Sequence, residues 1–216
     1  MSEVKVYRLK IEFPLAFFKI PYTVKTRKTY LIPRKRAILS LFNAFFEEPI
    51  SFWKVGRSRR RSRSQGEEIL SRFLVGAELI SFEKTIEIQR IIQIKGSSVE
   101  RPPSETELVV NAQYELYLIP KEEITLKKYP VNYYPYGGQN DYLASCWELD
   151  TLKGKIEKVD NTIFENYQLI DRNKLKFAEE IIVENALEKY VVAKGRVKFS
   201  QPVDILKVCD RDILIF

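Results

Sequence analysis

The strongest constraint on the fold is a strict alternation of apolar and polar residues near the start of the chain. Between residues 4 and 13, Tyr7, Leu9 and Ile11 occupy every second position, and charged residues lie between them. This period of two predicts a β-strand with one buried face. We expect Pro14 to end the strand.

A different period follows Pro33, a residue type that is well tolerated in the first turn of a helix. The apolar residues after it recur with spacings of three and four, which predicts a helix with one buried face. This stripe consists of Ile38, Leu41, Phe42 and Phe45. Residues 174–188 are the only other segment in which we consider a helix.

The rest of the chain is rich in short apolar or alternating runs, which predict strands. These runs cover residues 50–55, 73–80, 86–95, 107–119, 142–149, 190–193, 196–199, 203–208 and 213–216. The runs 86–95 and 107–119 flank a segment with Gly, Ser and Pro-Pro, so they predict an extended hairpin. Its apolar residues on both faces are typical of an arm that covers a partner. An ordinary hairpin within the sheet is the alternative.

These elements place the chain in the α+β class, dominated by antiparallel strands. A helix after the first strand suits a ferredoxin-like βαββαβ start, although the second helix of that motif is not evident. The 216 residues are enough for one large domain or two small ones. We divide the chain into a first domain, residues 1–150, and a β-rich C-terminal subdomain packed on it, residues 151–216.

The chain contains no histidine, and this absence limits its chemistry. Ser/His and Cys/His nucleophile pairs, histidine acid–base catalysis and histidine-ligated metals are all excluded. Cys146 and Cys209 lack metal-ligand spacing, and we expect them to be small buried residues. Phosphate-loop and dinucleotide-binding motifs are also missing. We therefore expect no cofactor, no metal and no catalytic residue.

The first residues run directly into the alternating pattern and do not resemble a signal peptide. No stretch approaches the roughly 20 apolar residues of a membrane span. We therefore expect a cytoplasmic protein with no membrane partner.

The net charge is +7, and two clusters in the first third of the chain hold much of the excess. Concentrated positive charge is typical of polyanion binders. In the first cluster, aromatic and hydroxyl residues alternate with cations, which suits base stacking and contacts to phosphate and sugar. Its cations are Lys25, Arg27, Lys28, Arg34, Lys35 and Arg36. The last three lie near the predicted helix start, where a bound anion would be favourable. Solvated surface charges are the alternative.

The second cluster is an arginine–serine loop between Gly56 and Gly66. A flexible loop of this composition suits sequence-independent contact with a phosphate backbone. Its cations are Arg57, Arg59, Arg60, Arg61 and Arg63. A solubilising loop is the alternative.

A third motif surrounds Gly137 and Gly138, which follow several closely spaced tyrosines. Paired glycines allow a tight turn or the close approach of a ligand to the backbone. The tyrosines suit a stacking surface, and they suit a core equally well.

The chain resembles the CRISPR-associated protein 5 family in two regions. The first comprises Phe13–Thr23, with its Phe-Lys-Ile-Pro-Tyr-Thr motif, then Thr29–Pro33 and Ala37–Leu39. The second, Tyr136–Leu143, is similar to the family's Gly-Gly-Asn-Asp-Tyr element, with Gln139 as an additional residue. Many relatives have Pro-Pro where this chain has Pro33-Arg34-Lys35, and the arginine–serine loop is not typical of the family.

The resemblance implies an RNA-recognition-like (RAMP) fold whose hairpin, about residues 86–119, acts as a thumb. It implies binding of the CRISPR RNA 5′ handle within a type I (Cascade) complex, next to the backbone subunit and the large subunit, with target DNA nearby. The positions carried over are Lys19, Tyr22, Thr23, Thr29, Tyr30, Gly137, Gly138, Asn140 and Tyr142.

Two alternative functions stay open. One branch of the family cuts precursor RNA, and a metal-independent ribonuclease here would have to use Tyr22 or Tyr30 with Lys25 or Lys28. The ordinary pKa values of tyrosine and lysine, about 10 and 10.4, are poorly matched to acid–base catalysis at neutral pH. The other alternative is a basic RNA-binding protein of a different ribonucleoprotein.

Overall fold

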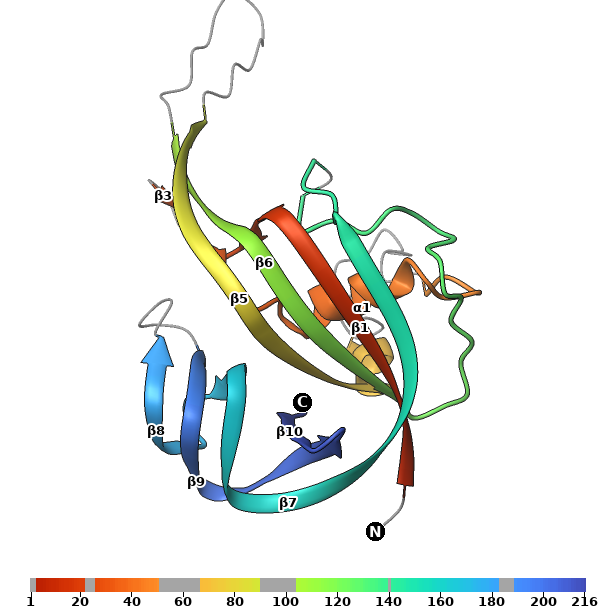
Figure 1. The fold of residues 1–216 in the computed structure, drawn as a ribbon, viewed down its shortest axis with the longest axis vertical. Helices are drawn as coiled ribbons and strands as arrows, with labels where there is room; N and C mark the ends of the chain where they lie inside the picture. Colours follow the sequence, from red (N-terminus) through yellow and green to blue (C-terminus); the bar gives the residue numbers. More distant parts are fainter. Residues whose placement is uncertain (1–2, 22–25, 51–66, 90–103, 140, 183–188) are drawn as a thin grey trace, which may run out of the picture.

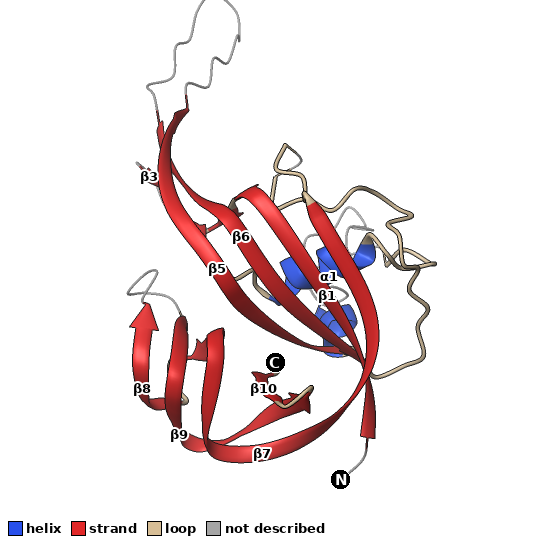
Figure 2. Cartoon of the chain, viewed as in Figure 1, coloured by secondary structure: helices blue, strands red, loops and turns tan. Residues whose placement is uncertain are grey.

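The computed structural model describes residues 3–21, 26–50, 67–89, 104–139, 141–182 and 189–216. Antiparallel strands dominate these residues, as predicted (Figure 2). One α-helix, α1 (Lys35–Asn43), and a short helical segment at residues 67–71 accompany them. The predicted strand at residues 50–55 and the arginine–serine loop lie almost entirely outside the described residues.

Four long strands form the main sheet (Figure 1). They are β1 (Glu3–Ala16), β5 (Phe73–Gln89), β6 (Ser104–Pro120) and the first part of β7 (Cys146–Asp171). Across the sheet the order is β7-β1-β6-β5, and every neighbouring pair is antiparallel. The first strand of the chain therefore lies in the middle of the sheet.

The alternation that predicted β1 sorts its side chains onto two faces. Tyr7, Leu9 and Ile11 point to one face, where α1 lies, and belong to the main hydrophobic core. The helical stripe that begins at Ile38 is buried in the same core, so the predicted helix is confirmed. The helix begins two residues after Pro33, with Arg34 at its N-cap.

The expectation that Pro14 ends the first strand is wrong. Pairing with β6 continues to Ala16, which lies opposite Val109. Pro14 itself is exposed and is skipped in the pairing between Phe13–Ala112 and Leu15–Val110, as is Asn111, whose φ of +49° marks an irregular position in β6. An irregularity of this kind tolerates a proline, because no regular ladder hydrogen bond is required there.

Strands β5 and β6 form a hairpin that is longer than expected. The runs 73–80 and 86–95 were predicted as separate strands, but β5 is continuous from Phe73 to Gln89, with two register shifts near Ser81. The far part of the hairpin extends beyond the end of β1 (Figure 1). Its tip, residues 90–103, lies outside the described residues.

The continuation of β7, from Lys155 onward, begins a second part of the fold, which we call the C-terminal half. This part pairs with β9 (Tyr190–Val208), which also pairs with β8 (Leu175–Ile182) and β10 (Arg211–Leu214). The helix considered at residues 174–188 is therefore wrong for residues 175–182, which form β8. Three strands predicted between residues 190 and 208 are one strand, β9.

The two halves share a second hydrophobic layer on the face of the main sheet opposite α1. Val6 and Tyr117 of the main sheet pack there against Leu206 and Ile213 of the C-terminal strands. A Cβ added at Gly76 of β5 would lie 2.6 Å from the Ile213 side chain, so only glycine allows this approach.

Three short strands come before α1 in the described residues. Strands β2 (Phe18–Lys19) and β4 (Thr29–Tyr30) pair with each other, and β3 (Thr26–Arg27) pairs with β6. Cys146 and Cys209 are exposed, which corrects the expectation that they are buried. Among the described residues, no helix has the length and apolar character needed to span a membrane.

Candidate nucleic-acid interface

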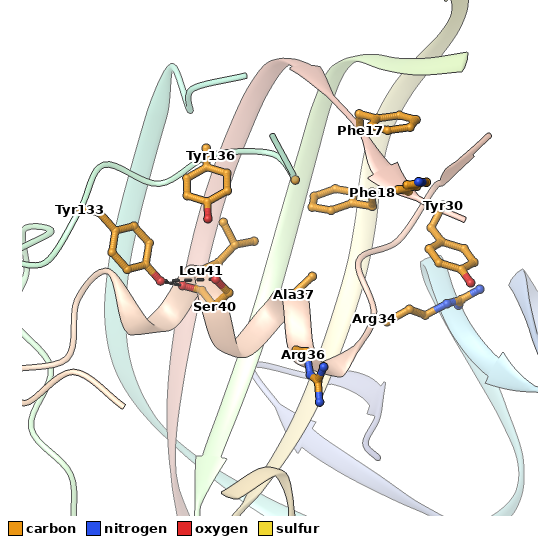
Figure 3. A pocket seen from close by; sticks show the side chains of 12 residues that line it. Phe17, Phe18, Tyr30, Arg34, Arg36, Ala37, Ser40, Leu41, Tyr133 and Tyr136 are labelled. Carbon is orange, nitrogen blue, oxygen red and sulfur yellow. Dashed lines mark hydrogen bonds between the residues drawn. The ribbon is translucent and has the colours of Figure 1, made fainter. Parts of the chain in front are cut away.

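A pocket of about 310 Å³ lies where three segments meet, and we call it the aromatic pocket. Its walls come from the β2–β4 hairpin, the start of α1 and the tyrosine-rich segment before Gly138 (Figure 3). Five residues predicted to bind RNA line it: Lys19, Tyr30, Arg34, Arg36 and Gly138. The pocket thus combines residues of the basic cluster and of the glycine motif, which are far apart in sequence.

The β2–β4 hairpin fixes the first wall through Thr29. The Thr29 hydroxyl accepts a hydrogen bond from the Phe18 amide at 2.9 Å and donates one to the Tyr30 carbonyl at 3.1 Å. Thr29 is fully buried and Tyr30 is 8% exposed. Thr29 therefore positions its neighbours and is not accessible to a ligand.

The glycine motif packs directly on the same hairpin. The Phe17 amide donates a hydrogen bond to the Gly137 carbonyl at 2.7 Å, and the Gly137 amide donates to the Tyr142 carbonyl at 2.7 Å. Gly138 has a φ of +87°, and an added Cβ would lie 2.1 Å from the Phe17 carbonyl oxygen. Its lack of a side chain permits both the backbone conformation and the contact.

Arg34 lies between two tyrosine rings. Its guanidinium carbon is 3.9 Å from the ring centroid of Tyr30 and 5.2 Å from that of Tyr190. Cation–π contacts of this kind hold a guanidinium in a fixed position. Figure 3 shows Arg34 beside Tyr30, and Arg36 projecting from the start of α1.

The start of α1 adds positive potential. Its first turn contains no acidic residue, and no side chain caps its amides. The positive end of the helix dipole favours a bound anion here. Arg36 is exposed, whereas Lys35 is half-buried and donates a hydrogen bond to the Phe216 carbonyl at 2.9 Å. Burial and the nearby Lys121 lower the pKa of Lys35.

Two tyrosines form the wall opposite the β2–β4 hairpin. Tyr133 donates a hydrogen bond to the Ser40 carbonyl of α1, and its ring centroid lies 6.0 Å from that of Tyr136 (Figure 3). Burial raises the pKa of Tyr133, so the phenol stays protonated at neutral pH. Aromatic walls beside cations suit an unstacked base with its phosphate.

The other predicted residues fall into two groups. Five are described but do not line the aromatic pocket: Arg27, Lys28, Lys35 and Tyr142 are half-buried, and Gly137 is buried. Arg27 lies 5.0 Å from the Phe17 ring centroid. The remaining predicted residues lie outside the described part of the chain: Tyr22, Thr23, Lys25, Arg57, Arg59, Arg60, Arg61, Arg63 and Asn140.

Comparison with known proteins agrees with the resemblance at the level of the fold. No family model and no curated protein sequence matches the chain. A crystal structure of a CRISPR protein from Archaeoglobus fulgidus aligns with a TM-score of 0.53 and 12% identity, covering 98% of both chains. A chain of a CRISPR RNA-guided surveillance complex aligns with a TM-score of 0.47 and 9% identity, covering 94% of this chain and 91% of that one. This protein therefore shares its fold with a CRISPR protein along nearly its whole length.

Proposed function

We propose that this protein is a non-catalytic RNA-binding subunit of a type I CRISPR interference complex, which holds the 5′ handle of the CRISPR RNA. The observation that carries the proposal is the meeting of both family-like motifs in one pocket lined by arginines and tyrosines. Its cations neutralise handle phosphates and its rings stack against bases.

The topology supports the ferredoxin-like part of this proposal. With β1, β5, β6 and β7 taken as the four strands, the order β7-β1-β6-β5 is the 4-1-3-2 order of an antiparallel βαββαβ sheet. The helix α1 occupies the first helical position. Residues 121–145, which are irregular wherever they are described, replace the second helix.

The β5–β6 hairpin is the proposed thumb, which packs on the neighbouring backbone subunit. Its far part carries the exposed residues Ile86 and Ile88, 60% and 70% accessible. Exposed apolar side chains on an arm favour burial against a protein partner. The large subunit and target DNA lie near this end of the assembly in the proposed complex.

The decisive experiment is copurification from the native cell, with sequencing of bound RNA and identification of bound proteins. We expect short RNAs that share one repeat-derived 5′ end, together with a backbone subunit. Mixed RNAs, or none, without such a partner would refute the proposal and favour another ribonucleoprotein.

A charge-matched pair of variants links the RNA to the pocket. Arg36→Ala removes an exposed cation of the pocket, and Lys176→Ala removes one from strand β8. If Arg36 contacts a phosphate, its loss reduces the slope of log K against log salt by about 0.7. The Lys176 variant should keep the wild-type slope. Equal slopes in all three proteins would place the RNA elsewhere.

The ribonuclease alternative has its own test. Purified protein in EDTA is incubated with a repeat RNA, and intact RNA is the expected result. Cleavage at one position would replace the non-catalytic proposal with an enzymatic one.

A further inference from the structure

A second pocket adjoins the aromatic pocket, and we call it the junction pocket. Its volume is about 450 Å³, within the range of about 300–1,000 Å³ typical of ligand sites. Tyr30, Arg34 and Arg36 line both pockets. The opposite wall comes from the C-terminal half, through Leu169 of β7 and Tyr190 of β9.

The junction pocket offers flat surfaces beside cations. Tyr190 lies next to the Arg34 guanidinium, and its ring centroid is 6.3 Å from that of Phe216. Arginine planes and aromatic rings are the surfaces on which proteins stack unpaired bases. The described residues that line this pocket include four cations and no acid.

The cations of the junction pocket differ in their contacts within the protein. Lys189 pairs with Asp171 at 3.0 Å, and Lys35 donates to the Phe216 carbonyl. Arg36 is exposed at the rim that both pockets share. A phosphate at this shared rim would join two nucleotides, one in each pocket.

We infer that the junction pocket binds a second nucleotide of the same RNA, adjacent to the one in the aromatic pocket, with its base against Tyr190 and Arg34. This inference rests on the proposed function. According to this inference, residues of the C-terminal half also contact the RNA. The two pockets together then form one binding site for two consecutive nucleotides.

The test measures how the effect of a substitution at position 190 on RNA affinity depends on the length of the RNA. Full-length wild type, Tyr190→Ala, Tyr190→Phe and the control Tyr129→Ala are titrated with labelled single-stranded RNAs of roughly two to eight nucleotides, within the reach of a single-strand groove. The RNAs carry the 5′ sequence recovered by copurification, or a mixed sequence if none is recovered. Tyr129 is 75% exposed and lines neither pocket.

We expect Tyr190→Ala to weaken binding of the longest RNA roughly tenfold, the effect of losing one base–aromatic stack. Tyr190→Phe and Tyr129→Ala should stay near wild type. The tenfold effect should disappear once the RNA is too short to fill both pockets. Unfolding midpoints measured on each variant separate loss of stacking from loss of fold.

A second variant keeps the test decisive if Tyr190→Ala unfolds. Lys189→Ala removes an exposed cation that lines the junction pocket, and it should weaken binding of the longest RNA while leaving binding of the shortest unchanged. Wild-type affinity of every folded variant at all lengths would overturn the inference and leave the proposed function intact. Absence of RNA binding by the wild type would overturn both.

Discussion

Gly138 joins the two sequence motifs through a contact that no other residue type can make. Two independent features require glycine here. The φ of Gly138 is positive, and an added Cβ would clash with the Phe17 carbonyl oxygen at 2.1 Å. A side chain here would both strain the backbone and push the glycine motif away from β2. The far wall of the aromatic pocket would move with it.

Substitution of this residue gives the first prediction. Gly138→Ala should lower the free energy of unfolding by at least about 2 kcal/mol, since the left-handed conformation alone costs roughly 1–2 kcal/mol for a residue with a Cβ. The measurement is urea denaturation. Asp141→Ala, at an exposed position of the same segment, is the control and should change stability by less than about 0.5 kcal/mol. An Ala variant as stable as wild type would contradict the contact.

Sequence patterns identified some pocket residues and missed others for a physical reason. Lys19, Tyr30 and Arg34 lie in a continuous run whose charge and aromatic content are visible locally. Tyr190 is isolated in the sequence, and it reaches Arg34 only because β9 pairs with β7. The glycine motif could be noticed from the sequence, but its packing on Phe17 depends on long-range contacts.

At the level of elements, the predictions succeeded where the signal was local. The helix α1 has its own apolar stripe, and β1 has its own alternation. The segment that forms β8 has mixed periodicity, and pairing with β9 decides its conformation. Strand β7 contains Gly154, and its pairing with β9 has two register shifts. No single apolar–polar period therefore runs through its 26 residues. Tertiary pairing overrides weak local preference in such segments.

The β9–β10 turn carries the second prediction. Cys209 and Asp210 have φ values of +49° and +59°, the two positive values that characterise a type I′ hairpin turn. Asn-Gly is the preferred pair for this turn. The double variant Cys209→Asn/Asp210→Gly should therefore raise the free energy of unfolding by about 1 kcal/mol.

Thermal or urea unfolding checks this increase. Asp160→Gly is the control, because Asp160 lies in strand β7 and has no positive φ. There the added backbone freedom of glycine should lower stability by about 0.5–1 kcal/mol. Destabilisation by the turn variant would show that the Cys209 or Asp210 side chain makes a contact that matters more than backbone strain.

At the scale of the whole molecule, a buried charged cluster connects the halves. Arg211 of β10 approaches Glu78 of β5 at 3.4 Å and Glu115 of β6 at 3.2 Å. The Tyr117 hydroxyl lies 3.0 Å from Glu78 and 2.9 Å from Glu115, and the two carboxylates share its single donor proton. Burial raises the pKa of Glu78 above its ordinary value of 4.5, although the hydrogen bonds from Tyr117 and Asn166 and the charge of Arg211 oppose the shift.

The raised pKa gives the third prediction. The folded protein holds the Glu78 proton more tightly than the unfolded chain does, so this residue reduces stability as the pH rises from about 4.5 through the raised value. Glu78→Gln removes this effect. The free energy of unfolding of the variant, minus that of the wild type, should therefore increase with pH over this window.

Urea denaturation at a series of pH values measures the difference. Glu122→Gln is the control of opposite sign, because the hydrogen bond from Arg72 lowers the pKa of the exposed Glu122. Its stabilising contribution is lost as the pH falls below 4.5, so its variant-minus-wild-type difference should decrease as the pH rises. A pH-independent difference for Glu78→Gln would show that burial does not govern this carboxyl group.

The central position of β1 has a consequence for synthesis of the chain. Both neighbours of this strand, β6 and β7, are translated after it, and its pairing with β7 extends to Lys155. As the nascent polypeptide leaves the ribosome, β1 therefore emerges long before either strand that will flank it. Its two hydrogen-bonding edges are not both paired until roughly two-thirds of the chain has been made. Unpaired strand edges can pair with other chains, so this interval is when the polypeptide is most exposed to aggregation or most dependent on a chaperone.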